Sequence, residues 1–456
     1  MTESEKIFVT KMTTQVENKT EVKRKGIRLG AFIVAFFIPL LFARQIFVNI
    51  SGGERHSVGT IVVIIAMLAI YTVLIIFLLK ESKGIRIFNA LTRPIFLLQI
   101  LLVLYWIILV FISPGGGSLV QRMMSSSYAA EFTLMIWVPV IFFTSEKDVR
   151  RAVKILIIAA AIVGLIGILQ WFVPETNLPV LLKGDRTVFM SGTMFGTTRV
   201  NGLIGTPLEF ALLMAMMALL FYIRLMDRLS FSSLIMFTIM FLGLAFAASR
   251  TFWIVTVGAM LIITLLHRRK RLLSLLVPIV LIFTILIIPS VRNYFYEPMV
   301  TQHSGYVASG ESKILSVKKA LGELRSSPLI GTGLGFQTAP AFGDSSKKII
   351  GDGFWWAILL EGGILGFLLV FGFLGLIGRT FLIALKNKNS QRSIFVQQLI
   401  EWGIVFVGIA VLGNFINSSL NNLSLNIAFY LMIGIVLATI NIEFRKRSAQ
   451  ETITKT

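Results

Sequence analysis

Apolar runs long enough to cross a lipid bilayer follow one another along most of the chain, separated by short polar links. A spanning helix needs about 20 apolar residues, and by this criterion the pattern predicts about twelve spans. The expected fold class is therefore an all-α polytopic membrane protein. The predicted spans are Arg28–Asn49, Val58–Leu79, Pro94–Ser113, Tyr128–Thr144, Lys154–Val173, Thr206–Tyr222, Phe231–Phe246, Thr251–His267, Leu272–Pro289, Phe354–Leu376, Ile394–Leu412 and Leu423–Asn441.

One long polar stretch interrupts this pattern after the ninth predicted span. The chain thus divides into a tail (1–27), nine spans (28–289), a large loop (290–352), three spans (353–442) and a second tail (443–456). Loops of this length are uncommon in compact chains and are usually functional or disordered. Because glycines and apolar positions recur in this loop in an ordered pattern, we expect it to be functional.

The positive charges predict how the spans are oriented. Lys and Arg concentrate in alternate links, and the positive-inside rule assigns their common side to the cytoplasm. Both termini are then cytoplasmic, and loop 290–352 lies outside. The link Ala247–Arg250 is very short, but a single span across it would turn the basic cluster Arg268–Arg271 outward. The charges therefore favour two spans at this position.

Composition agrees with a membrane protein and excludes several other classes. The chain is 56% hydrophobic and 14% charged, whereas soluble domains have about 25% charged residues. Its net charge of +21 lies mostly between apolar runs, so we expect no nucleic-acid partner. Cysteine is absent, and the three histidines (His56, His267 and His303) are too scattered for a zinc motif.

Ionisable residues recur near the outer ends of several predicted spans. Charges within spans are costly and are functional candidates by default. The alternative is local pairing, or snorkelling of a long side chain to the interface. The residues in question are Arg44, Glu131, Glu209, Arg250 and Glu361.

Two arginines and two carboxylates have side chains suited to particular chemistry. Arg199 and Arg250 suit a phosphate ligand, because a guanidinium offers phosphate oxygens a planar fork of donors. Asp352 precedes the tenth span and is either a helix cap or a general base. Glu361 would lie about 13 Å deeper along that helix. It would act on the substrate directly or orient a neighbouring arginine.

Glycines and an amphipathic segment add further expectations around the large loop. The spacing of Gly362 and Gly366 predicts close helix packing. Segment Glu311–Arg325 has the pattern of a basic amphipathic helix, which would lie on lipid head groups or pack on the bundle. The glycines within 331–335 form a turn or direct backbone N–H groups toward a phosphate.

Three motifs together resemble those of a known family. ASRTFW opens one span, RVNGLIGTPLEFALLMA opens another, and SPLIGTGLGF is followed by GDGFWWAILLEGGILGFLL. Two outer segments with arginines come first, then the large loop, then a helix with Glu-Gly. In these motifs and their order, residues 128–376 resemble the bacterial O-antigen ligase and O-antigen polymerase superfamily.

The resemblance implies an integral membrane glycosyltransferase of the bacterial plasma membrane. It would move glycan from a polyprenyl diphosphate carrier on the outer face to the hydroxyl of a glycan or lipid-linked acceptor. Neither a cofactor nor a metal is expected. The bilayer and other polysaccharide-assembly proteins are the further partners that the resemblance suggests.

Site residues are carried over from the family one position at a time. Arg199, Arg250 and, by a looser alignment, Lys313 would bind the donor diphosphate, with Asp352 and Glu361 catalytic. Ligases show His-Asn where this chain has Asp-Gly, and this departure favours a polymerase over a ligase. The supporting residues expected are Glu209 and Arg44.

Two other functions compete with a glycosyltransferase. About twelve spans also suit a polysaccharide flippase or another secondary transporter. Transporters, however, place substrate near the bilayer midplane and are often built from internal repeats, whereas here the charges cluster at outer span ends and no repeat is evident. The second alternative is a non-catalytic membrane partner in an assembly complex.

Overall fold

A computed structural model describes a large part of the chain as a bundle of helices. The described residues are 68, 71–72, 75, 89–113, 119–173, 200–204, 206–247, 249–266, 317–318, 320–335, 353–387, 392–415, 419–421 and 423–453. Within these ranges every regular element is a helix. Six of these helices are long and apolar enough to cross a membrane, or seven if one bent pair forms a single span. A multi-pass membrane protein fits this finding, and the count of twelve spans stays a prediction.

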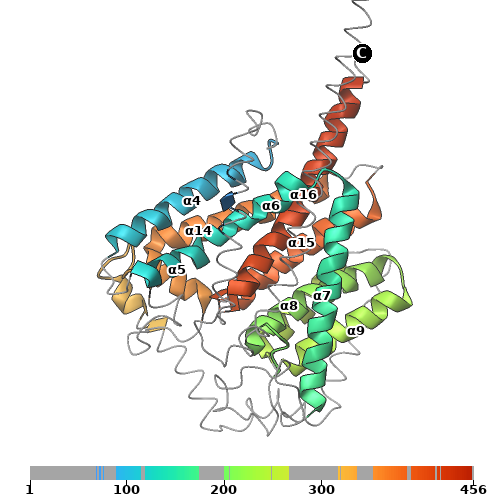
Figure 1. Ribbon diagram of the computed structural model, residues 1–456, viewed down its shortest axis with the longest axis horizontal. Coiled ribbons are helices and arrows are strands. Elements are labelled where there is room, and N and C mark those ends of the chain that lie inside the picture. Colours follow the sequence, from blue (N-terminus) through green and yellow to red (C-terminus); the bar gives the residue numbers. More distant parts are fainter. Residues whose placement is uncertain are drawn as a thin grey trace, which may run out of the picture.

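Most described helices coincide with predicted spans (Figure 1). In Figure 1, α4 and α14 lie side by side, and α16 extends beyond the other helices. The helices are α4 (Arg93–Ile112), α5 (Leu119–Ala129), η2 (Glu131–Ile136), α6 (Trp137–Phe142), α7 (Glu146–Phe172), α8 (Pro207–Asp227), α9 (Phe231–Phe246), α10 (Arg250–Leu266), α14 (Phe354–Lys386), α15 (Ile394–Gly413), η8 (Ser419–Asn421) and α16 (Leu423–Ile453).

Helix α7 begins earlier than its apolar run predicts, at Glu146 instead of Lys154. Ser145 and Asp148 form a capping box, in which each side chain accepts a hydrogen bond from the backbone N–H of the other residue. Such a box satisfies N–H groups that have no partner inside the helix. The cap, and not the start of the apolar run, therefore determines where α7 begins.

The region around residue 130 differs from its prediction. Pro114–Ser127 was expected to be a link, but α5 begins at Leu119, and the pair Gln121–Ala129 and Glu131–Phe142 is bent by 42°. Counting apolar residues misses α5, because its end is rich in serine. After the bend, Gln99 of α4 donates to Thr133 at 2.8 Å and accepts from the Trp137 indole N–H.

Helices α9 and α10 are two separate elements, but both are shorter than the six candidate spans, and the prediction that each crosses the membrane stays a prediction. The rings of Phe241 and Trp253 lie 4.7 Å apart. Residues twelve positions apart in one straight helix would be separated by about 18 Å. The chain therefore turns sharply between the two helices, and α10 packs mainly on α8 and α15.

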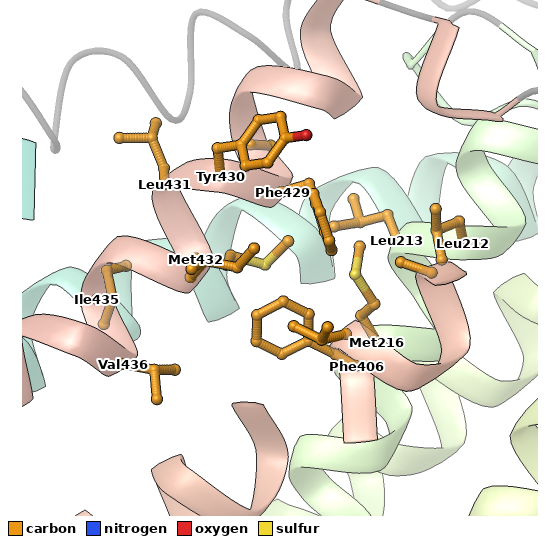
Figure 2. Packing of buried hydrophobic residues seen from close by; sticks show 14 of the residues in the cluster. Leu212, Leu213, Met216, Phe406, Phe429, Tyr430, Leu431, Met432, Ile435 and Val436 are labelled. Carbon is orange, nitrogen blue, oxygen red and sulfur yellow. The ribbon is translucent and has the colours of Figure 1, made fainter. Parts of the chain in front are cut away.

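The core lies where α8, α15 and α16 pack together. Figure 2 shows Met216, Phe406, Phe429 and Met432 converging from these three helices. Trp402 of α15 donates its indole N–H to the Met216 carbonyl oxygen at 2.7 Å. All these side chains are buried, and they belong to one hydrophobic core that runs through the described helices.

Polar contacts join the helix termini at one end of the bundle, which we call the basic end. The Gln398 side chain donates to Asp227 at 2.7 Å, and Ser393 donates to Glu146 at 3.1 Å. Lys446 also lies 3.6 Å from Glu146. The end of α8 thus meets the start of α15, and the start of α7 meets both Ser393 and Lys446 of α16.

The basic end is predicted to face the cytoplasm. We expect Leu119→Cys, at the start of α5, to react with an impermeant maleimide on cells whose plasma membrane is intact. Leu229→Cys, between α8 and α9, should react only after lysis. The parent chain has no cysteine and is the background control. The reverse labelling pattern would contradict the orientation.

Candidate functional site

The opposite end of the bundle, the site end, brings together segments that the sequence singled out separately. The Val200 N–H donates to the Phe246 carbonyl oxygen at 3.4 Å. Arg199, which directly precedes Val200, lies outside the described residues. Arg250 follows the end of α9 by four positions and begins α10, where it is half-buried. Chain segments that carry two candidate phosphate-binding arginines are thus joined to each other.

The last turn of α7 holds this junction from a second side. The Gln170 carboxamide makes two hydrogen bonds of 3.0 Å with the backbone of Gly202, and Trp171 stacks on Phe246 with ring centroids 4.7 Å apart. The sequence analysis did not single out Gln170. The sequence feature that could have identified it is a lone glutamine in the last turn of an apolar span, where a polar side chain needs a hydrogen-bond partner.

Phe210 of α8 fills a space lined by glycines from three segments. A Cβ atom on Gly202 would lie 2.7 Å from its ring, one on Gly243 would lie 3.2 Å away, and one on Gly167 would also collide with it. Larger residues at these positions would push α7 and α9 away from α8. The start of α8 is therefore fixed by packing close to the junction.

Glu209 lies at the start of α8 and is buried. It accepts a hydrogen bond from the Thr206 N–H at 2.9 Å, and the Thr206 hydroxyl accepts one from the Glu209 N–H. For Glu209, local pairing was the alternative to a functional role, and this capping box is such a pairing. A supporting role in the site stays a prediction.

The start of α14 also lies at the site end. Trp356 donates its indole N–H to the carbonyl oxygen of Phe415, just past the end of α15, at 3.1 Å. Phe252 of α10 packs against Gly413 at the same end of α15. Asp352, adjacent to the first residue described here, Gly353, lies outside the described residues. The starts of helices α10 and α14 thus both contact the end of α15.

Helix α14 is interrupted, although the sequence predicted a continuous span. Gly363 has φ +64° and ψ −170°, a conformation essentially confined to glycine. Segment 327–335 crosses the interruption. The Ile364 N–H donates to the Pro328 carbonyl oxygen at 2.9 Å, and the Thr332 N–H donates to that of Leu360 at 2.7 Å. The backbone groups freed by the interruption therefore find partners in this segment.

Glu361 is fully buried beside the interruption. Its Oε1 accepts hydrogen bonds from the Ser125 hydroxyl at 3.3 Å and from the Gly335 N–H at 3.1 Å. Gly335 is one of the glycines within 331–335 that were considered as phosphate-binding donors. Its backbone N–H is donated to a carboxylate of the protein itself. Through these bonds Glu361 ties together α14, α5 and segment 327–335.

The two glycines predicted to allow close packing do so. A Cβ atom on Gly362 would lie 2.8 Å from the Trp106 ring of α4, and one on Gly366 would lie 3.3 Å from it. The neighbouring Tyr105 hydroxyl donates to the Gly362 carbonyl oxygen at 2.6 Å. Close packing here is confirmed, but it takes place around an interrupted helix.

The described part of the large loop packs on the bundle. Ala320 is buried against Leu360 and Trp356 of α14, and Leu334 is fully buried. The Ser113 hydroxyl accepts a hydrogen bond from the Leu334 N–H at 2.7 Å. Within segment Glu311–Arg325, Ala320 and Leu324 are buried whereas Leu321 is 47% exposed, so the buried positions fit packing on the bundle and contact of the exposed face with lipid head groups stays a prediction.

Arg44 and Lys313 lie outside the described residues, as do Arg199 and Asp352. In the described part of the chain, no group of three or more His, Cys, Asp and Glu side chains could hold a metal ion. No protein-family model and no curated protein matches this chain.

A methyl group at the interruption of α14 should destabilise the protein. In Gly363→Ala the new Cβ atom would meet the Leu329 carbonyl oxygen and lie 2.6 Å from the Gly331 nitrogen. Strained dihedral angles and crowding together should cost about 2–6 kcal/mol. Thermal unfolding of purified protein in detergent measures this loss.

Gly372→Ala is the matched control, because Gly372 lies in the same helix with open space around its Cβ position. It should keep or raise the unfolding temperature. Equal unfolding temperatures for the two variants would show that the interruption does not require glycine.

Proposed function

We propose that this protein is a membrane glycosyltransferase of the bacterial plasma membrane. It transfers or polymerises polyprenyl-diphosphate-linked oligosaccharide on the outer face, and polymerase activity is favoured over O-antigen ligation. One observation carries the proposal. The hydrogen bond between Val200 and Phe246 joins the segments that carry Arg199 and Arg250, two cations suited to a diphosphate.

The chemistry follows from the charge that develops when the donor reacts. As the bond between the sugar and its diphosphate breaks, negative charge builds on the leaving oxygen. Guanidinium groups held in a partly dry site stabilise that charge more strongly than water does, because they need not reorganise. Arg199 and Arg250 have this role in the proposal, and Lys313 and Arg44 add positive charge around it.

The acceptor side of the proposal uses the start of α14. Asp352 is the general base that removes the proton of the acceptor hydroxyl as it attacks the anomeric carbon. Glu361 is assigned an orienting role, because its Oε1 already accepts two hydrogen bonds from the protein. Glu209 supports the site by capping α8.

A secondary transporter is the second candidate, since interrupted helices are typical of that class. The depth of the interruption favours the first candidate. Gly362 packs on Trp106, six residues before α4 ends at Ile112. At 1.5 Å per residue, Trp106 and the interruption beside it lie about 9 Å from the site end of α4, which is about 30 Å long. A transporter site would be expected nearer the midplane.

Arg250→Lys should abolish most polymer formation at normal protein levels. Lysine keeps the charge but loses the planar fork, so we expect a loss on the order of 10² in rate. The assay is extension of a polyprenyl-diphosphate-linked repeat unit by purified protein. Arg228→Lys, at the basic end, is the control and should keep full activity. Full activity of Arg250→Lys would exclude a required bidentate contact.

Neutral, near-isosteric variants distinguish the two carboxylates. Asn caps a helix about as well as Asp, so Asp352→Asn should fold normally but lose on the order of 10²–10⁴ in rate. Glu361→Gln keeps an oxygen that accepts from Ser125 and Gly335, and its loss of rate should be smaller. Wild-type rate in Asp352→Asn together with an inactive Glu361→Gln would assign the base to Glu361.

A further inference from the structure

We propose that the headgroup of an anionic phospholipid binds at the basic end, where α14 ends beside α16. The Arg447 guanidinium of α16 donates from Nη2 to the carbonyl oxygen of Asn387, which directly follows α14, at 2.9 Å. Lys386 is the last residue of α14, and its side chain is exposed. A lysine and an arginine from two different helices are thus brought close together at the surface.

A third cation lies beneath these two. Arg392 donates to the carbonyl oxygen of Ala384, in the last turn of α14, at 2.8 Å, and its side chain is only 7% exposed. Burial lowers the pKa of Arg392, Glu443 opposes this shift, and repulsion by Arg447 adds to it. Within the described part of the chain, the Nε atoms of Arg392 and Arg447 have no hydrogen-bond acceptor.

The carboxylates near these cations are already shared with other basic groups. Glu443 lies 3.8 Å from Arg392 and 3.5 Å from Lys446. Glu146 lies 3.6 Å from Lys446 and also pairs with Arg150. Positive charge therefore remains in excess where α14 meets α16. An anion held at the surface of this cluster would offset the repulsion between its arginines.

Exposed apolar side chains lie one helical turn nearer the site end than the two surface cations. Leu382 precedes Lys386 by four positions and is 47% exposed, and Phe444 precedes Arg447 by three and is 40% exposed. Residues three or four positions apart share one face of a helix. An acyl chain packed against Leu382 and Phe444 would therefore place its phosphate beside the two cations.

This combination of charge and apolar surface distinguishes a phospholipid from a free anion. A phosphate ion gains nothing from exposed leucine and phenylalanine side chains, whereas an acyl chain does. Basic pockets between spanning helices on the cytoplasmic side are typical binding sites for anionic headgroups. The basic end is the end that the charges predict to face the cytoplasm.

Lys386→Gln combined with Arg447→Gln tests the inference by removing two positive charges. The probe is dioleoylphosphatidylglycerol, titrated against detergent-purified protein and counted by native mass spectrometry. A cation near a headgroup contributes about 1 kcal/mol, so we expect the Kd of the first bound lipid to rise on the order of 30-fold. Arg151→Gln combined with Arg228→Gln is the matched control. Both residues are exposed cations toward the same end, and the Kd should stay nearly unchanged.

Two comparison ligands test what the site recognises. The parent chain should bind dioleoylphosphatidylglycerol more tightly than dioleoylphosphatidylcholine or inorganic phosphate. Equal affinity for the zwitterionic lipid would overturn the inference, because the cations would then not recognise the headgroup. Equal affinity for inorganic phosphate would overturn a phospholipid as the ligand. An equal rise in Kd for both double variants would reduce the effect to net charge and would also overturn the inference.

A single variant keeps the inference testable if the double variant does not fold. Lys386 is exposed, so Lys386→Gln should fold normally. Its Kd for dioleoylphosphatidylglycerol should rise about fivefold, whereas that of Arg228→Gln should not. An unchanged Kd in folded Lys386→Gln would overturn the inference.

Discussion

A peptide group in hydrocarbon has no water to bond with, so irregular backbone there must find its hydrogen-bond partners within the protein. The described part of this chain meets that constraint in different ways. At Gly363, the backbone of segment 327–335 supplies the partners. At Gly202, one glutamine side chain supplies both a donor and an acceptor. At the bend after α5, the Thr133 hydroxyl donates to the Ala130 carbonyl oxygen.

These solutions work only because large rings pack against residues without side chains. Phe210 occupies the space left by glycines of α7, α9 and the segment before α8, and Trp106 lies over two glycines of α14. The irregular backbone is thereby enclosed and shielded from lipid. Stability and the geometry of the site end depend on the same contacts, so a change that loosens one should also alter the other.

The two ends of the bundle are held in different ways. Contacts at the basic end include partly exposed ion pairs, such as that of Lys446 with Glu146, and pairs of this kind contribute about 0–1 kcal/mol each. Those at the site end are largely buried hydrogen bonds and close packing, which tolerate little displacement.

The sequence by itself determined the class of protein and the positions of most described helices, because apolar runs of bilayer length have few other stable arrangements in water or lipid. It also separated α9 from α10 through the charges that follow them. Only the tertiary structure decided where α14 is interrupted and what Glu361, Gln170 and Ser125 contact. The partners of these groups lie far away along the chain, and a local pattern carries no information about which distant backbone groups will lie beside them.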